Sequence, residues 1–163
     1  MSLEFRDIFL KQKEAIRKRS LEVFALIQPA HLSFKPEPGA LALGEMLQHM
    51  WRSEEGVRRV ALDDNFAYYE VRVPQGVFPT LGPLQTLEEN LRNLERVHKE
   101  TLAAVAGYPA ERFEEERVRD DLKFRRKAFT ILLAINEHEI HHRAQMMSYL
   151  RMLGTPVSEA ARR

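Results

Sequence analysis

The chain of 163 residues contains no cysteine. It can therefore form no disulfide and supply no thiolate, so a metal ion would have to be held by His, Asp, Glu or amide side chains. No run of about 18 apolar residues occurs, so we expect no membrane-spanning segment. Residues 1–18 carry charge every few positions and lack the apolar core of a signal peptide, which predicts a cytoplasmic protein.

The chain also lacks an excess of charge of either sign. It has 25 Lys and Arg against 24 Asp and Glu, a net charge of +1, which gives no reason to expect binding to nucleic acid or to an anionic membrane. Apolar residues make up 44% and charged residues 30%, an ordinary composition for a globular protein. We therefore expect a single domain over residues 1–163 with a core of its own.

Apolar residues recur with helical spacing in four long segments, and no segment alternates with period two for long enough to predict a sheet. Thr86 and Glu89 form a capping box before the third segment, and Gly154 with Pro156 ends the fourth. This pattern predicts an all-α fold, a four-helix bundle. The predicted helices cover residues 2–27, 41–62, 87–106 and 122–153.

The connection over residues 63–82 is rich in proline and glycine, which predicts a loop rather than a helix. At this length it suits a long crossover between the second and third helices, so those helices would run parallel in an up-down-down-up bundle. Tyr68, Tyr69 and Phe78 in this loop either cover a pocket or pack on a bundle end.

Histidines interrupt the apolar stripes of two helices. His138 and His142 are four residues apart, so their rings lie one turn above each other and can chelate one metal ion. His49 lies on the stripe of the second helix, and the next two stripe positions hold the small residues Ser53 and Gly56. Small neighbours leave the space that an open coordination position for water or substrate would need. The pattern predicts one metal ion shared by the three histidines.

Three other interpretations of these histidines remain open. They could form a hydrogen-bonded polar core without metal. His141 could instead be a ligand, but it points about 100° around the helix from His142, so this requires the helix to be rotated. Residues 138–142 also fit the HExxH pattern of zinc metallopeptidases, with Glu139 as general base. Strands that would hold an extended peptide are not predicted, and Glu159 is the only acidic residue downstream, so a peptidase is the less favoured reading.

Two sequence segments are similar to those of a known family. Residues 138–145 (HEIHHRAQ), followed by YLR at 149–151 and LG at 153–154, resemble the C-terminal signature of the DinB superfamily. Residues 43–50 (LGEMLQHM) resemble the family's first histidine motif. One departure is Ala144, where the family often has glycine, and it affects helix packing more than the ligand set.

The resemblance implies an up-down-down-up four-helix bundle that holds a divalent metal ion, zinc or nickel, on His49, His138 and His142. It also implies a homodimer, and the apolar Leu132, Leu133, Met146 and Met147 agree, because one core does not obviously need them all. Characterised relatives include transferases and isomerases that use low-molecular-weight thiols, and some hydrolases.

Three imidazoles with a fourth position open make a Lewis-acid site that activates either water, for hydrolysis, or a thiol, for S-transfer. Because the chain has no cysteine, the thiol would be a cosubstrate beside a small-molecule substrate. We therefore expect a metal-dependent thiol transferase or hydrolase. The alternatives are a non-catalytic metal-binding stress-response protein and a purely structural bundle.

Five further residues are candidates for roles around the metal. Gln145 lies near His142 along the helix and could orient water or substrate, and Glu45 lies one turn before His49 and could accept a hydrogen bond from an imidazole. The residues that could bind a substrate carboxylate near the mouth of the site are Arg52, Arg143 and Tyr149.

Overall fold

The computed structural model describes residues 2–70, 81 and 83–157, and these are mostly helical, as predicted. Four long helices occur in this part of the chain: α1 (Ser2–Phe24), α2 (Leu43–Asp63), α4 (Leu87–Gly107) and α5 (Ala128–Met152). Short 3-10 helices lie at Pro29–His31, Ala110–Glu114 and Asp120–Leu122. None of the described helices has both the length and the apolar character that crossing a membrane requires.

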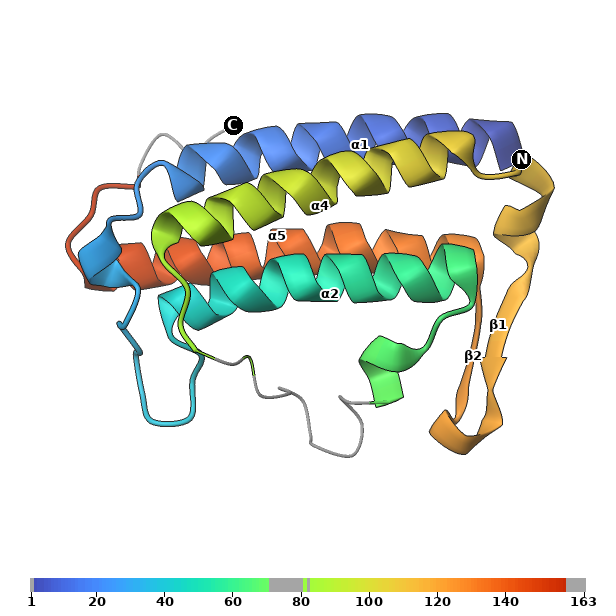
Figure 1. Cartoon of the computed structure of the whole chain (residues 1–163). Helices are drawn as coiled ribbons and strands as arrows, with labels where there is room; N and C mark the ends of the chain where they lie inside the picture. Colours follow the sequence, from blue (N-terminus) through green and yellow to red (C-terminus); the bar gives the residue numbers. More distant parts are fainter. Residues whose placement is uncertain (1, 71–80, 82, 158–163) are drawn as a thin grey trace.

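The four long helices lie side by side (Figure 1). In that view α1 and α5 run in one direction, whereas α2 and α4 run in the other. Helix α2 packs against both α4 and α5, and α1 packs against α5 and, less extensively, α4. Residues 71–80 and 82, which belong to the predicted crossover, lie outside the described residues.

Helix ends follow local hydrogen-bonding chemistry. The capping box before α4 is present as predicted: Thr86 Oγ1 accepts from the Glu89 N–H at 3.2 Å, and Glu89 Oε2 accepts from the Thr86 N–H at 2.8 Å. Helix α1 ends at Phe24, earlier than predicted, because the chain tightens into three-residue turns before Pro29. Residues 67–70 are helical, so the prediction of a loop throughout residues 63–82 is wrong there.

The prediction that the chain has no strands is also wrong. Strands β1 (Glu116–Arg119) and β2 (Phe124–Lys127) form an antiparallel hairpin where the fourth helix was expected to begin. The residue of β1 that is buried is Arg117, whose Nε donates to the Ala61 carbonyl at 2.9 Å and whose Nη2 donates to the Tyr108 hydroxyl. Because its buried position holds arginine, the strand shows no apolar alternation.

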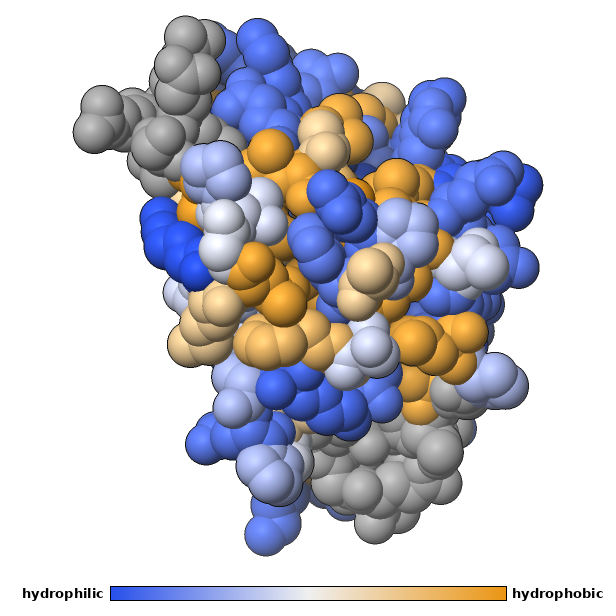
Figure 2. Space-filling model, turned by 90° about the vertical axis from the view of Figure 1, so that its left-hand side faces the viewer, coloured by the Kyte–Doolittle hydropathy of each residue, from blue (hydrophilic) through white to orange (hydrophobic). Residues whose placement is uncertain are grey.

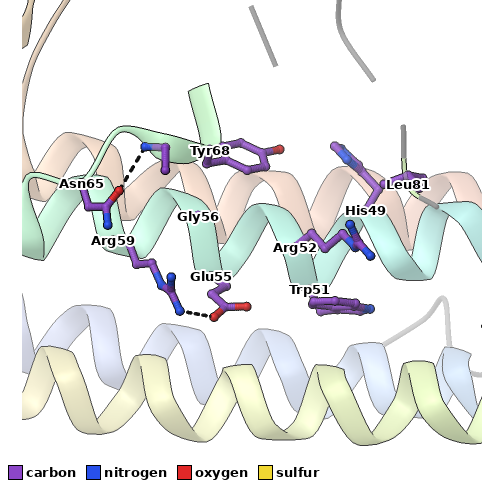
Figure 3. A pocket seen from close by; sticks show the side chains of 10 residues that line it. His49, Trp51, Arg52, Glu55, Gly56, Arg59, Asn65, Tyr68 and Leu81 are labelled. Atoms are coloured by element: carbon purple, nitrogen blue, oxygen red, sulfur yellow. Dashed lines mark hydrogen bonds and ion pairs between the residues drawn. The ribbon is translucent and has the colours of Figure 1, made fainter. Parts of the chain in front are cut away.

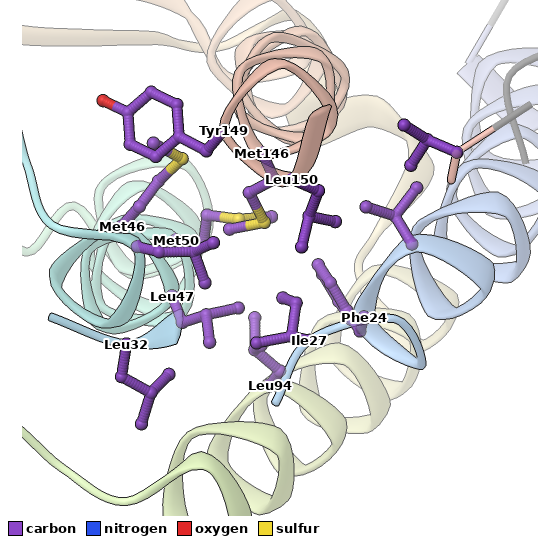
Figure 4. Packing of buried hydrophobic residues seen from close by; sticks show 13 residues of the cluster. Phe24, Ile27, Leu32, Met46, Leu47, Met50, Leu94, Met146, Tyr149 and Leu150 are labelled. Atoms are coloured by element: carbon purple, nitrogen blue, oxygen red, sulfur yellow. The ribbon is translucent and has the colours of Figure 1, made fainter. Parts of the chain in front are cut away.

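The apolar core consists of two clusters at opposite ends of the helices. The first, around Leu47, Met146 and Leu150, lies where α1 ends and α2 begins (Figure 4). The second, around Phe9, Val60 and Leu132, lies toward the other end. Each long helix contributes residues to both clusters, and between these residues it carries buried polar side chains. They include Lys13 and Arg17, His49, Ser53 and Glu54, Thr101, and Asn136, Glu139 and His142.

We expect the stability of the fold to depend on pH through His98, which feels the charges of this polar layer. The side chain is partly buried on α4, and burial together with the charge of Arg17 lowers its pKa from 6.5 to about 4. Between those pH values the unfolded chain takes up a proton that the folded chain does not, so stability is lost as the pH falls. Solvent screening reduces the effect at a partly exposed group, and we expect about 1 kcal/mol between about pH 7 and about pH 5.

Urea unfolding of the wild type and of His98→Gln at both pH values measures this contribution. The variant is expected to lose less stability on acidification than the wild type. Equal losses in the two proteins would show that His98 does not titrate differently in the folded and unfolded chains.

Candidate metal centre

The three histidines predicted to share a metal ion come together between α2 and α5. His138 Nε2 lies 2.9 Å from His49 Nε2 and 3.0 Å from His142 Nε2. One ligand nitrogen from each of the three rings lies within 4.8 Å of the others. The i,i+4 spacing on α5 sets two of the rings together, and the packing of α2 against α5 brings the third.

In two of the three rings, the Nδ1 atom, on the other side of the ring from Nε2, contacts a polar side chain. His142 Nδ1 lies 2.8 Å from Gln145 Oε1, and because an amide oxygen can only accept, this contact places the proton on Nδ1 and the lone pair on Nε2. His49 Nδ1 lies 3.3 Å from Ser53 Oγ, which in turn lies 2.7 Å from the Tyr68 hydroxyl. Burial lowers the pKa of His142, which favours the neutral imidazole that binds metal.

These residues fit a divalent metal ion. Tetrahedral zinc with bonds of about 2.0–2.1 Å keeps its nitrogen ligands about 3.3 Å apart. The two shorter Nε2 separations, 2.9 and 3.0 Å, are a few tenths of an ångström below this, so small ring movements would admit the ion. Neutral imidazole suits zinc and nickel. His141, the alternative ligand, is exposed on α5 and lies outside the triad.

A cavity of about 370 Å³ reaches the triad at His49 (Figure 3). Arg52, one of the candidate substrate ligands, lines it together with Trp51 and Tyr68. The space predicted beside Gly56 is filled by the Tyr68 ring: a Cβ on Gly56 would lie 2.3 Å from Tyr68 Cγ. Gly56 and Tyr68 both line the cavity, and Phe78, also considered for the pocket, lies outside the described residues.

The other candidates take different positions. Glu45 Oε2 accepts from the Ala42 N–H at 2.7 Å and pairs with Lys35 at 3.0 Å, so Glu45 caps the start of α2 rather than supporting an imidazole. The Arg143 guanidinium donates to the Ile16 carbonyl of α1 at 3.2 Å. Tyr149 is buried in the first apolar cluster. Of the five candidates, Gln145 and Arg52 are the ones beside the triad or its cavity.

Glu139, the carboxylate of the HExxH pattern, belongs to a buried ion-pair network. Lys13 Nζ donates to Glu139 Oε2 at 2.7 Å and to Glu54 Oε2 at 2.8 Å. Arg17 Nε donates to Glu139 Oε1 at 2.8 Å. Burial opposes ionisation, but these cations outweigh it and hold the pKa of Glu139 far below its usual range. A carboxylate bound in this way is a poor general base, which disfavours a peptidase.

Sequence reasoning missed this network. Its signal was present on α1, where Lys13 and Arg17 lie between the buried residues Phe9 and Ser20 at helical spacing. In the same register the apolar Ile8 and Ala15 are exposed. Cations at buried helix positions require buried anions, and these are Glu54 and Glu139.

Comparison with known proteins agrees with this architecture. The crystal structure of a DinB-like protein from Bacillus subtilis superposes with a TM-score of 0.69 at 20% sequence identity, over 91% of this chain and 92% of that one. No curated protein matches. Residues 12–146, which span both histidine motifs, match the DinB superfamily. The sequence match, which covers most of the chain and includes all three clustered histidines, shows that the chain belongs to the DinB superfamily.

Proposed function

We propose that this protein is a metal-dependent enzyme that binds zinc or nickel through His49, His138 and His142. The observation that carries the proposal is the convergence of three imidazole nitrogens, two pairs of them separated by 2.9 and 3.0 Å, beside a cavity open to a small molecule. The reaction is S-transfer or hydrolysis, because a metal ion on three imidazoles can activate a thiol or water. Since the chain has no cysteine, the thiol would be a low-molecular-weight cosubstrate.

The residues around the three histidines have separate roles in this proposal. A bound divalent ion supplies Lewis-acid activation of a thiol or of water. Gln145 fixes the tautomer and orientation of His142, and Ser53 orients His49 while Tyr68 holds Ser53. The cavity at His49 admits the substrate.

A second candidate is a metal-binding stress-response protein without turnover. The position of Glu139 favours this candidate. Lys13 and Arg17 bind this carboxylate of the HExxH pattern, so it is not available for proton transfer. Both candidates require the metal, and assays with thiol cosubstrates separate them.

We also propose that the four long helices form an up-down-down-up bundle in a homodimer. The directions of the helices in Figure 1 support the topology. Figure 2 shows apolar side chains among the charged ones on the end where the first apolar cluster lies. Leu21 on α1, Leu84 just before α4 and Met152 at the end of α5 are 55%, 46% and 64% exposed near that end. By contrast, Leu132 and Met146, which were expected to be available for a dimer interface, are fully buried within the chain.

Metal content tests the proposed function. Protein purified without a histidine tag or added metal is expected to carry about one divalent ion per chain by elemental analysis, as a single three-histidine site requires. Removing the ion with a chelator is expected to lower the melting temperature, because a ligand at a thousand times its Kd stabilises the folded state by about 4 kcal/mol. Protein that binds neither zinc nor nickel when they are added would exclude the site.

A further inference from the structure

Among the described residues that line the cavity at His49, Arg52 is a cation whose charge is not balanced by an ion pair. Arg59 pairs with Glu55 at 2.6 Å, and Glu55 is also approached by Arg96 at 3.6 Å. Arg52 has no ion pair among the described residues. Residues 71–82, the part of the connection that follows Glu70, contain no Asp or Glu that could pair with it.

Arg52 is placed to meet a ligand. Its guanidinium carbon lies 5.0 Å from the centre of the Trp51 ring, and the side chain lies between Trp51 and His49 in Figure 3. Its Nε is buried and has no hydrogen-bond partner among the described residues. Buried donors in folded proteins are normally satisfied. Because Arg52 lines the cavity, an acceptor supplied by a ligand there would complete the hydrogen bonds of its guanidinium.

We propose that Arg52 binds the carboxylate of a small molecule whose other end lies at His49 and so reaches the metal. The planar guanidinium matches a carboxylate with two parallel hydrogen bonds, and the charge of Arg52 suits a single negative charge. Trp51 and Tyr68 offer apolar walls to the body of the molecule. A volume of about 370 Å³ fits a compact metabolite. This inference rests on the proposed function, since it names the substrate class of the same cavity.

The carboxylate subsite can be tested without metal. Metal-free protein is titrated by calorimetry with phenylpropionate and with phenylpropanol, which differ in the carboxylate. The acid is expected to bind at least about ten-fold more tightly than the alcohol, and Arg52→Gln is expected to abolish this preference, since only the charged guanidinium pairs with the carboxylate.

Arg59→Gln is the matched control, because it removes the same charge from a guanidinium on the same wall that is already paired with Glu55. It is expected to change the affinity for phenylpropionate by less than about three-fold, the effect of a distant screened charge. Equal binding of acid and alcohol by the wild type, or equal losses in the two variants, would overturn the assignment of Arg52.

A second titration separates this inference from the metal proposal. Protein loaded with Co²⁺ is titrated with mercaptopropionate and with mercaptopropanol while the visible spectrum of the ion is recorded. Both thiols are expected to change the spectrum, and the acid at a concentration about ten-fold lower. Equal affinities would leave the metal site intact and refute the carboxylate subsite. A spectrum that neither thiol changes would refute thiol activation, whereas the calorimetric result for Arg52 would still stand.

Discussion

Replacing His49 with alanine is expected to weaken metal binding by at least about 100-fold, more than is usual for loss of a residue that only orients a ligand. His138 and His142 are already held together on α5, whereas His49 is the ligand that joins α2 to that pair. The fold is expected to survive, because two apolar clusters hold the four helices together without the ion. Removing the buried ring should cost about 1–3 kcal/mol of stability.

The measurements are competition titration against a metal-binding dye for affinity, circular dichroism for helicity, and urea unfolding of the metal-free protein for stability. His141→Ala is the matched control, since it removes an exposed histidine from the same helix. It should leave affinity unchanged. If His49→Ala kept full affinity while His141→Ala lost it, the ligand set would have to be reassigned to the exposed histidine.

The triad could be predicted because helical spacing relates sequence directly to position. The stripe positions named on the second helix, His49, Ser53 and Gly56, are buried in the structure. Helix α5 buries His142 in the same way, although the apolar Met152 at its end is 64% exposed. A histidine at a regularly spaced buried position needs a buried partner, so three such histidines point to one another.

Other features could not be read from spacing because polar atoms occupy the buried positions. The β1–β2 hairpin buries Arg117, which bonds to the Ala61 carbonyl and the Tyr108 hydroxyl, contacts that are distant in sequence. The contact between Gly56 and Tyr68 is of the same kind. A glycine on a helix indicates either empty space or close approach, and the sequence alone does not distinguish the two.

The buried ion pairs lead to the second large effect, from replacing Lys13 with methionine. Lys13 Nζ joins Glu54 of α2 and Glu139 of α5, and Arg17 Nη2 also donates to both, at 2.9 and 3.0 Å. Without Lys13, two buried carboxylates would share one cation. Breaking a buried pair on one side costs about 3–5 kcal/mol, a large part of the about 5–15 kcal/mol that stabilises a typical domain. Urea unfolding of the metal-free protein measures the loss.

Burial, rather than the length of the ion pair, should decide this cost, and two further variants test that reason. Lys99→Met breaks a 2.6 Å pair with Glu95 on the exposed face of α4 and should cost no more than about 0.5 kcal/mol. Lys13→Met combined with Glu54→Gln leaves Arg17 facing the single carboxylate of Glu139, so the network is neutral again, and much of the lost stability should return. If the double variant were as unstable as Lys13→Met, the loss would come from the packing of the lysine chain and not from uncompensated charge.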